Sequence, residues 1–227
     1  MILVTLFLKL IIQMQSNLDK LIQKFGSPIA LIDNWRDEFI GYAIWDFEEI
    51  LEWNYNGLYL SGKKQKIASL DAVQKILNTW KKDDSNKISS VGYINYNFKD
   101  ILFPHIKFKK GDRNFPLLFF GKPKKIIKYK VHQSQYAISD FLHLNSDIME
   151  LKDYKKIINK IKSELSEGNA YQINYTMPKK FKVSKNALSI YLYFRNIIKP
   201  KFGYYLQCNN YKILSFSPEQ FFKVKNN

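Results

Sequence analysis

The order of secondary-structure patterns after residue 148 is the feature that most constrains the fold of this chain. A helix with one apolar stripe comes first, and Gly168 follows it in the position of a left-handed C-cap. The segments after it are AYQINYT and KKFKV as strands, NALSIYLYFRNII as a helix, and FGYYLQC, YKILSFS and QFFKV as strands. A tight hairpin is predicted from Cys208 to Tyr211. Hairpin connections predict an α+β fold, with antiparallel β-sheets forming a layered sandwich and helices packed outside.

The first half of the sequence predicts a similar mixture of elements. SNLDKLIQKFG is a helix pattern with Ser16 as its N-cap and Gly26 at its end, and Ser69 caps a second helix, SLDAVQKILNTWKKD. SPIALID, SVGYINYNF (a strand over 91–97), FPLLFFG and KKIIKYKVH are strand patterns. The polar stretch 133–147 has little pattern and marks a domain boundary. We therefore predict an N-terminal domain over 14–147 and the start of a second, truncated domain over 148–227.

The first thirteen residues are a separate question, because they are mostly apolar. They are too short to span a bilayer and lack a basic leader and a small-residue cleavage site, so no membrane partner is expected. Two interpretations remain open. Residues 1–13 form a buried first strand, or they are a spurious extension upstream of a true start at Met14.

Charge and cysteine content exclude several functions. The net charge is +16, yet only three of the basic residues are arginines, Arg36, Arg113 and Arg195. Because arginine is the preferred reader of phosphates and bases, we expect no nucleic acid partner. Cys208 is the only cysteine, so an internal disulfide and a cysteine zinc cluster are excluded, and a cytoplasmic location is expected.

Isolated motifs indicate no catalytic centre. Gly62, Lys63 and Lys64 lack the spacing of a phosphate-binding loop. The three histidines, at positions 105, 132 and 143, are far apart in the sequence and form no metal-ligand pattern. No catalytic residue and no metal ligand is therefore predicted in this chain.

Three linked segments carry more information than any single residue. They are EGNAYQINYT after the amphipathic helix, KPKFGYYLQ after the next helix, and ILSFSPEQFFKV near the end. In this order and spacing they resemble the chorismate-utilising enzymes, a family that includes anthranilate synthase component I, aminodeoxychorismate synthase component I, and isochorismate and salicylate synthases. The family patterns are G-D-x-x-Q-x-N-L, P-Y/F-M/S-x-x-L and S-P-E-x-F. VGYINYNF is also similar to the family's G-Y-x-x-Y-D strand, with Asn97 in place of the aspartate.

The resemblance implies a set of ligand-binding residues. Gln172 and Asn174 match the first motif, on one face of a predicted strand, where amides can satisfy neighbouring backbone or line a pocket for an anionic dicarboxylate or an amino acid. We favour a scaffold role with partial pocket lining. Ser217 and Glu219 match the third motif, and Glu219 is expected to pair with a lysine or to orient a neighbouring segment.

The family also has an amino-acid pocket in its N-terminal domain, and the resemblance implies its walls here. The expected lining residues are Asn34, Phe39, Tyr42, Lys201, Phe202 and Gly203. Asn34 stands where a serine that binds the ligand's ammonium group is usual, and Lys201 replaces a common proline. A lysine would repel a ligand ammonium unless it points away, which argues against tryptophan as the ligand.

The complete family enzymes imply further expectations. Their second half carries P-I-x-G-T, glutamates that hold magnesium, and a catalytic histidine, and none of these motifs occurs here. The chain is therefore predicted to be the N-terminal portion of such an enzyme, inactive alone, and is interpreted as a truncated or frame-shifted product, a deliberate fragment, or one half of a split enzyme.

The branch of the family is also predicted. The short N-terminal region and the absence of L-L-E-S favour aminodeoxychorismate synthase over anthranilate synthase. The expected substrate of the complete enzyme is chorismate, its cofactor is Mg²⁺, and its partners are a glutamine amidotransferase subunit and a separately encoded C-terminal half. A non-catalytic binding module remains the alternative from another functional class.

Overall fold

Two compact units make up the fold. The computed structural model describes residues 17–35, 39–81, 88–109, 111, 113–132, 142–144 and 149–221. The first unit contains residues 1–135 together with 191–227, and the second contains residues 136–190. The predicted domain boundary at 147/148 stays a prediction. It rests on sequence pattern and family resemblance, whereas the two units are defined by how compactly the chain is folded.

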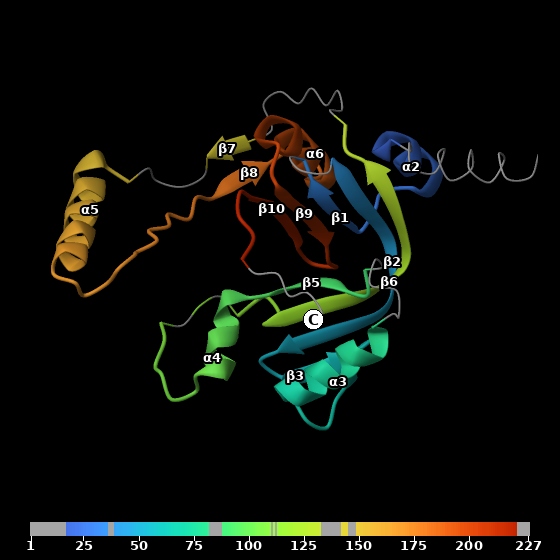
Figure 1. Ribbon diagram of the computed structural model, residues 1–227, viewed down its shortest axis with the longest axis horizontal. Helices are drawn as coiled ribbons and strands as arrows, with labels where there is room; N and C mark the ends of the chain where they lie inside the picture. Colours follow the sequence, from blue (N-terminus) through green and yellow to red (C-terminus); the bar gives the residue numbers. More distant parts are fainter. Residues whose placement is uncertain are drawn as a thin grey trace, which may run out of the picture. The chain divides into compact units, whose positions relative to one another are not determined.

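An antiparallel sheet is the centre of the first unit (Figure 1). Its strands are β1 (Ala30–Asn34), β2 (Ile40–Asn54), β3 (Gly57–Leu60), β4 (Lys63–Lys64), β5 (Val91–Ile94), β6 (Leu118–Lys130), β9 (Phe202–Gln207) and β10 (Lys212–Ser217). Their order is β10-β9-β1-β2-β3-β4, and β6 pairs with both β2 and β5. Every pairing among the described strands is antiparallel, which confirms the predicted α+β class.

The long strands β2 and β6 bend together. Their register shifts between Ile44 and Glu49, where β-bulges interrupt the pairing. Before the bend β2 pairs with β1, and after it β2 pairs with β3. One pair of strands is therefore shared by two parts of the core.

Two hydrophobic clusters pack against this bent pair of strands. The first joins β2, β3 and β6 to the helix α3 (Leu70–Trp80), and its buried residues are Leu51, Trp53, Leu58, Val73, Trp80, Phe98, Leu117 and Leu118. The second joins β1, β2, β5, β6 and β9, and its buried residues are Ala30, Ile44, Val91, Phe119 and Leu206. Leu58 and Leu206 are both fully buried. Such burial contributes roughly 2 kcal/mol for each large aliphatic side chain.

The helix caps follow the local sequence. Helix α2 (Leu18–Phe25) begins at Asn17, whose side chain accepts a hydrogen bond from the Asp19 amide at 3.0 Å, so the predicted N-cap at Ser16 is wrong. Ser69 caps α3 as predicted, with its Oγ accepting from the Ala72 amide at 3.1 Å. Gly26 ends α2 with φ = 77°, a conformation that glycine adopts without strain.

The segment after β5 differs from the predicted strand over 91–97. β5 ends at Ile94, and a 3₁₀ turn, η1 (Tyr96–Phe98), leads directly into α4 (Lys99–Leu102). The reason is Asn95, whose side chain accepts from the Asn97 amide at 3.0 Å and caps the turn. Asparagine competes with strand pairing in this way whenever it precedes a turn.

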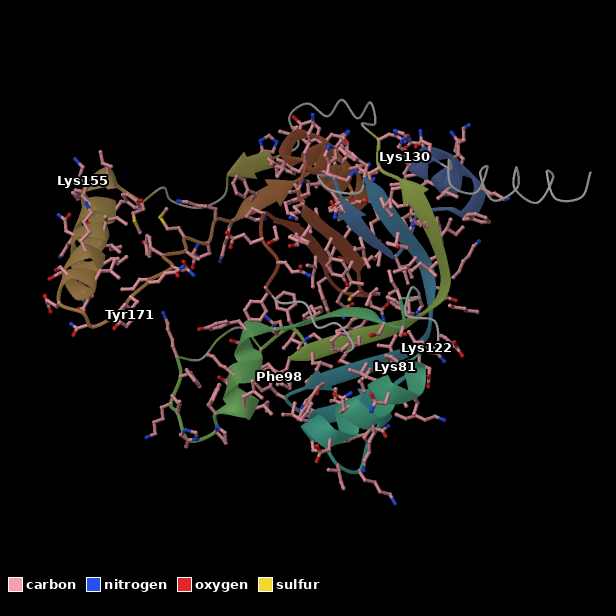
Figure 2. The ribbon with its side chains drawn as sticks, in the orientation of Figure 1. Lys81, Phe98, Lys122, Lys130, Lys155 and Tyr171 are labelled. Atoms are coloured by element: carbon pink, nitrogen blue, oxygen red, sulfur yellow. The ribbon has the colours of Figure 1, made fainter. Side chains whose placement is uncertain are left out.

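The second unit contains one long helix and a short strand pair. Helix α5 (Leu151–Ser166) ends as predicted, with Gly168 in the left-handed region at φ = 74°, and β7 (Leu142–Leu144) pairs with β8 (Phe181–Val183). None of the residues of α5 is buried among the described residues. Figure 2 shows Lys155 projecting from α5, and Tyr171 just after it is fully exposed.

The strand predicted for AYQINYT is wrong. Residues 172–180 have no regular secondary structure, and no described strand pairs with them. Gln172 and Asn174 are both exposed, and they contact each other, with Gln172 Nε2 donating to Asn174 Oδ1 at 3.4 Å. An alternating pattern forms a strand only where a neighbouring strand satisfies its backbone groups.

The helix α6 (Ala187–Ile198) and the final hairpin agree with prediction. Asn186 accepts from the Ser189 amide at 2.8 Å at the start of α6. The β9–β10 hairpin closes through the Cys208 amide, which donates to the Tyr211 carbonyl at 2.9 Å. Gln220 and Phe221 are not in a strand, and the remainder of the predicted strand QFFKV lies outside the described residues.

Candidate functional site

A pocket of about 350 Å³ lies on one face of the strands β10, β9, β1 and β2. The register explains how the pocket forms, because Ile32 lies opposite both Tyr42 and Tyr204, and Tyr204 lies opposite Ser215. Residues directly opposite each other in neighbouring strands share a face of the sheet. The pocket, called here the four-strand pocket, is lined by Ile32, Asp33, Asn34, Ile40, Tyr42, Lys201, Phe202, Gly203, Tyr204, Ser215 and Ser217.

The structure brings together six of the ten predicted ligand-binding residues. Asn34, Tyr42, Lys201, Phe202, Gly203 and Ser217 line the four-strand pocket, although they come from four segments of the chain. This grouping shows where the residues lie, and their role in binding stays a prediction.

The other four predicted residues are not among those that line this pocket. Phe39 is about half exposed, at 46%, and its carbonyl accepts from the Val131 amide at 2.8 Å. Glu219 is exposed, and its backbone carbonyl accepts from Ser217 Oγ at 2.7 Å. Gln172 and Asn174 belong to the second unit, so the structure does not place them with the pocket residues.

The opposite face of the same strands contains a buried polar cluster that sequence reasoning missed. Asp33 Oδ2 lies 3.2 Å from Arg195 Nη1 and accepts from the Tyr191 hydroxyl at 2.7 Å. The Tyr129 hydroxyl donates to Asp33 Oδ1 and accepts from Arg195 Nη1 at 3.3 Å. The side chains of Asp33 and Arg195 are 0% and 1% exposed. We call these four residues the Asp33 cluster.

The electrostatics of the Asp33 cluster follow from its burial. Burial and the neighbouring Asp33 carboxylate raise the pKa of both Tyr129 and Tyr191 well above the ordinary value, so both remain neutral donors. Burial is the largest single effect on Arg195 and lowers its pKa, but Asp33, Tyr129 and Tyr191 together outweigh it and the pKa is raised. The cluster is therefore an ion pair of zero net charge, in which Asp33 is fully hydrogen-bonded while Arg195 Nε has no hydrogen-bond partner among the described residues.

A sequence signal for this cluster exists. Arg195 is the only charged residue in the otherwise apolar helix sequence ALSIYLYFRNII, and Asp33 follows the apolar run IALI in β1. A charged residue in each of two apolar elements predicts a buried pair, because an isolated buried charge is too costly.

The lining of the four-strand pocket offers mainly hydrogen-bond donors. Hydroxyl groups come from Tyr42, Tyr204, Ser215 and Ser217, and Lys201 supplies an ammonium group. The buried Tyr204 hydroxyl has no hydrogen-bond partner among the described residues, and burial raises its pKa. The only carboxylate in the lining, Asp33, is occupied by its cluster. Such a lining can hold a carboxylate group but offers no pair of groups for acid–base or nucleophilic chemistry.

The described residues do not form a magnesium site. No group of three or more histidine, cysteine, aspartate or glutamate side chains is arranged there to hold a metal ion. The residues present therefore do not fit the Mg²⁺ that the family resemblance implies. Nor does the described part of the chain contain a helix with the length and apolar character needed to cross a membrane.

Comparison with known proteins agrees with the sequence motifs. Residues 139–227 match the family model described as chorismate binding enzyme. The structure is similar to that of anthranilate synthase component I from Streptococcus pneumoniae TIGR4, with a TM-score of 0.62 and 12% sequence identity. The similarity covers 82% of this chain and 52% of that chain, so this chain spans about half the length of its structural relative. No curated protein sequence matches it. The C-terminal residues 139–227 are thus similar to chorismate binding enzymes, and the chain shares the fold of an anthranilate synthase component I.

Proposed function

We propose that this chain is the N-terminal portion of an aminodeoxychorismate synthase component I. The complete enzyme would convert chorismate and ammonia to 4-amino-4-deoxychorismate in the para-aminobenzoate branch of folate synthesis. The observation that carries the proposal is the family match over residues 139–227 in a chain with the fold of a component I enzyme. The absence of L-L-E-S around Leu31–Asn34 favours this branch.

The chain alone is proposed to be inactive and to work with a C-terminal half. Supporting this, the described residues contain no site for Mg²⁺, and no residue of the apolar stripe of α5 is buried. The stripe consists of Tyr154, Ile157, Ile158, Ile161 and Leu165. Leu151 is 66% exposed, and Phe181 and Val183 of β8 are 49% and 50% exposed. An exposed apolar surface of this kind marks an interface. A separately encoded half would cover it and supply magnesium ligands, and a glutamine amidotransferase subunit would deliver ammonia.

The four-strand pocket is proposed as a ligand site of the same enzyme. Its donors and Lys201 suit the carboxylate of a small anion or an amino acid. A ligand bound there would not react. Its effect on the enzyme would be transmitted by the sheet that carries the Asp33 cluster.

A second candidate function is supported by one specific observation. The structural relative is an anthranilate synthase component I, so the fold supports a portion of an anthranilate-forming enzyme equally well. A non-catalytic subunit of a split enzyme shares that support, and the product of a reconstituted reaction separates these alternatives.

The test is chorismate turnover with Mg²⁺ and ammonia, measured for the chain alone, for the polypeptide encoded immediately downstream, and for their mixture. We expect turnover only in the mixture, with 4-amino-4-deoxychorismate as product. Anthranilate as the product would replace the proposed branch with the second candidate. Turnover by the chain alone would contradict its proposed inactivity. The absence of turnover in all three samples would contradict the proposal that the chain works with a C-terminal half.

A matched pair of variants tests the docking face. Ile161→Asp places a charge on the apolar stripe of α5, whereas Lys160→Asp places the same charge on an exposed position one residue earlier. We expect the first variant to lose turnover in the mixture and the second to retain it. Equal activity of the two variants would show that this face of α5 does not dock.

A further inference from the structure

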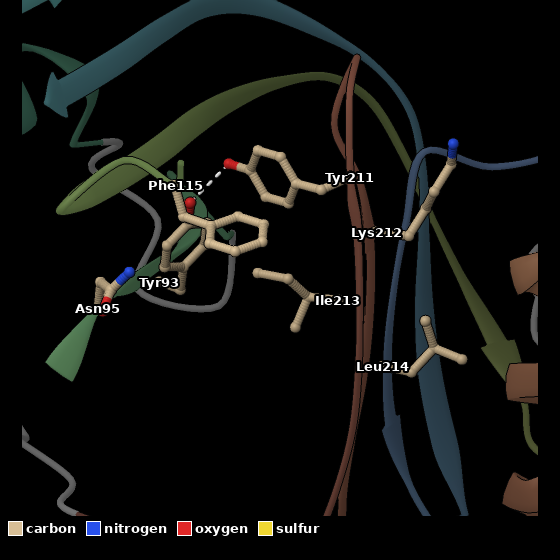
Figure 3. A pocket seen from close by; sticks show the side chains of 7 residues that line it. All are labelled: Tyr93, Asn95, Phe115, Tyr211, Lys212, Ile213 and Leu214. Atoms are coloured by element: carbon tan, nitrogen blue, oxygen red, sulfur yellow. Dashed lines mark hydrogen bonds between the residues drawn. The ribbon is translucent and has the colours of Figure 1, made fainter. Parts of the chain in front are cut away.

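A second cavity, of about 420 Å³, lies between β5, β10 and the segment before β6. Its lining residues are Tyr93, Asn95, Phe115, Tyr211, Lys212, Ile213 and Leu214, and none of them is among the predicted ligand-binding residues (Figure 3). Figure 3 shows Ile213 on the same side of β10 as the rings of Tyr93 and Phe115, whereas the Lys212 ammonium points away from them. Aromatic and aliphatic groups therefore form the walls of this aromatic cavity.

The rings hold one another in place. The Phe115 and Tyr211 rings meet edge to face with centroids 5.2 Å apart, and the Tyr93 and Tyr211 rings do so at 6.2 Å. Phe119 stacks on Tyr93 at 6.0 Å with its ring nearly parallel. Because these contacts restrain the rings before any ligand arrives, binding a flat ring there costs little reorganisation.

A count of protons and hydrogen bonds identifies a donor that is available at the cavity. The Tyr93 and Tyr211 hydroxyls share one hydrogen bond of 2.5 Å, and Tyr211 also hydrogen-bonds with the Cys208 thiol. These three groups carry three protons but make two hydrogen bonds, so one proton is left to donate. Either hydroxyl can be the donor in the Tyr93–Tyr211 bond, and with Tyr211 as the donor the spare proton is that of Tyr93, which lines the cavity (Figure 3).

Asn95 supplies a second donor. Its Oδ1 accepts from the Asn97 amide at 3.0 Å and its Nδ2 donates to the Pro116 carbonyl at 3.3 Å, which together fix the orientation of the amide. One Nδ2 hydrogen is left over from these two bonds. In Figure 3 this nitrogen lies on the side of Asn95 that faces Tyr93.

The charge of the surroundings disfavours an anion. Burial raises the pKa of Tyr93 to about 12 and also raises the pKa of Tyr211 and of the Cys208 thiol, so all three are neutral at pH 7. The negative charge of Glu52 adds to this effect at Tyr93 and Cys208. A carboxylate placed here would meet that negative potential with no cation directed at it among the described lining residues.

We propose that the aromatic cavity is a binding site for a small, neutral aromatic molecule that carries a hydrogen-bond acceptor. The ring lies against Phe115, Tyr211 and Ile213, and the acceptor receives hydrogen bonds from Tyr93 and Asn95. The site is distinct from the four-strand pocket, and its ligand differs in charge from chorismate.

Three probes of nearly equal size test the proposal with the full chain. Benzamide is neutral and aromatic with a carbonyl acceptor, benzoate has the same shape with a negative charge, and cyclohexanecarboxamide lacks the aromatic ring. Ligand-observed NMR titration gives each dissociation constant. We expect saturable benzamide binding, with benzoate and cyclohexanecarboxamide at least about tenfold weaker. Equal binding of benzamide and benzoate would overturn the proposed charge preference.

Three variants locate the binding. Ile213→Trp should fill the cavity and abolish benzamide binding, and Tyr93→Phe should weaken it about fivefold by removing one donor. Lys212→Gln is the control, because its side chain points away from the cavity, and it should bind as the parent does. Circular dichroism checks that each variant is folded, and Tyr93→Phe decides the question if Ile213→Trp is not. Benzamide binding that is unchanged in the folded variants would overturn the site.

Discussion

At the scale of single residues, Asp33 is the most constrained side chain of the first unit. Its carboxylate is buried together with Arg195, and Tyr129 and Tyr191 complete its hydrogen bonds. Gly41 contributes by having no side chain, since a Cβ there would lie 2.6 Å from Asp33 Oδ1 and 2.7 Å from a Tyr129 ring carbon. The residues around Asp33 must therefore supply a counter-ion and hydrogen bonds and also leave room for the carboxylate.

Removing the charge of Asp33 should destabilise the protein strongly. In Asp33→Asn the Arg195 cation stays buried without its counter-ion, and we expect a loss of about 3–5 kcal/mol in the free energy of unfolding. Urea unfolding measures this loss. Asp46→Asn is the matched control, because Asp46 pairs with Lys124 at 3.3 Å on the surface and should cost less than about 1 kcal/mol. Equal losses in the two variants would contradict the importance of the buried pair.

The buried tyrosines predict a loss of stability at alkaline pH. The pKa values of Tyr129 and Tyr191 are raised in the folded protein, so above about pH 10 the unfolded chain releases phenolic protons that the folded chain retains. The free energy of unfolding should therefore be unaffected by these groups below that pH and fall as the pH rises further. Urea unfolding between about pH 8 and pH 11 measures the slope.

Two tyrosine variants separate this effect from the titration of lysines. Tyr129→Phe should make the alkaline decline shallower. Tyr171→Phe should leave it unchanged, because Tyr171 is fully exposed. An identical slope in both variants would show that the buried phenol does not contribute.

At the scale of elements, the bent pair β2 and β6 determines how the rest is attached. Its first half carries β1 and the face with the four-strand pocket, and its second half carries β3, β5 and α3. The bulges between Ile44 and Glu49 redirect the strands without ending them. Both hydrophobic clusters therefore depend on the same two strands.

The contact between β5 and β6 should be sensitive to one methyl group. A Cβ on Gly92 would overlap the carbonyl oxygen of Phe119 and lie 2.7 Å from the Phe120 Cα, and both obstacles are backbone. We expect Gly92→Ala to lower the free energy of unfolding by about 1–3 kcal/mol. Thermal and urea unfolding measure the change. Ile94→Ala, at a position on the same strand that is 57% exposed, should cost less, and a larger loss there would contradict this explanation.

Local patterns predicted the elements whose hydrogen bonds are local. Gly26, Ser69 and Gly168 marked helix ends correctly, and the β9–β10 hairpin lies where Cys208 to Tyr211 predicted it. Gln172 could not be placed, because a strand needs a partner that the segment itself does not specify.

The long-range features of the site were harder to predict. The Asp33 cluster joins residues 162 positions apart, and no short window contains both of its charges. The four-strand pocket was predicted in part only because the family motifs mark its walls at Asn34, Tyr42 and Lys201. No motif predicts that the aromatic cavity brings Tyr93 and Tyr211 together, because the two residues are 118 positions apart and meet only in the folded chain.

At the scale of the whole molecule, the two units differ in how much they bury. The first unit contains both hydrophobic clusters, whereas α5 in the second buries none of its side chains among the described residues. A helix without tertiary packing is marginal in water, since its own hydrogen bonds barely offset the entropy of ordering it. The second unit should therefore gain most from a binding partner.

Hydrogen exchange should report this difference directly. In the chain alone we expect the amides of α5 to exchange at least about a hundredfold faster than those in the centres of β2 and β6. Adding the polypeptide encoded downstream should slow exchange in α5 and leave β2 unchanged. Equal protection of α5 and β2 in the chain alone would contradict the marginal stability of the second unit.

The position of β1 in the sheet has a consequence for the order in which the molecule is completed. β1 is made early in synthesis, yet one of its two neighbours is β9, at residues 202–207, and the counter-ion of Asp33 is residue 195. Until those residues leave the ribosome, β1 has an open edge and a carboxylate that must stay in water. The sheet can close around β1 only after residues 195–207 have been translated, so this part of the core forms by contacts between segments far apart in the sequence, which are slow to form.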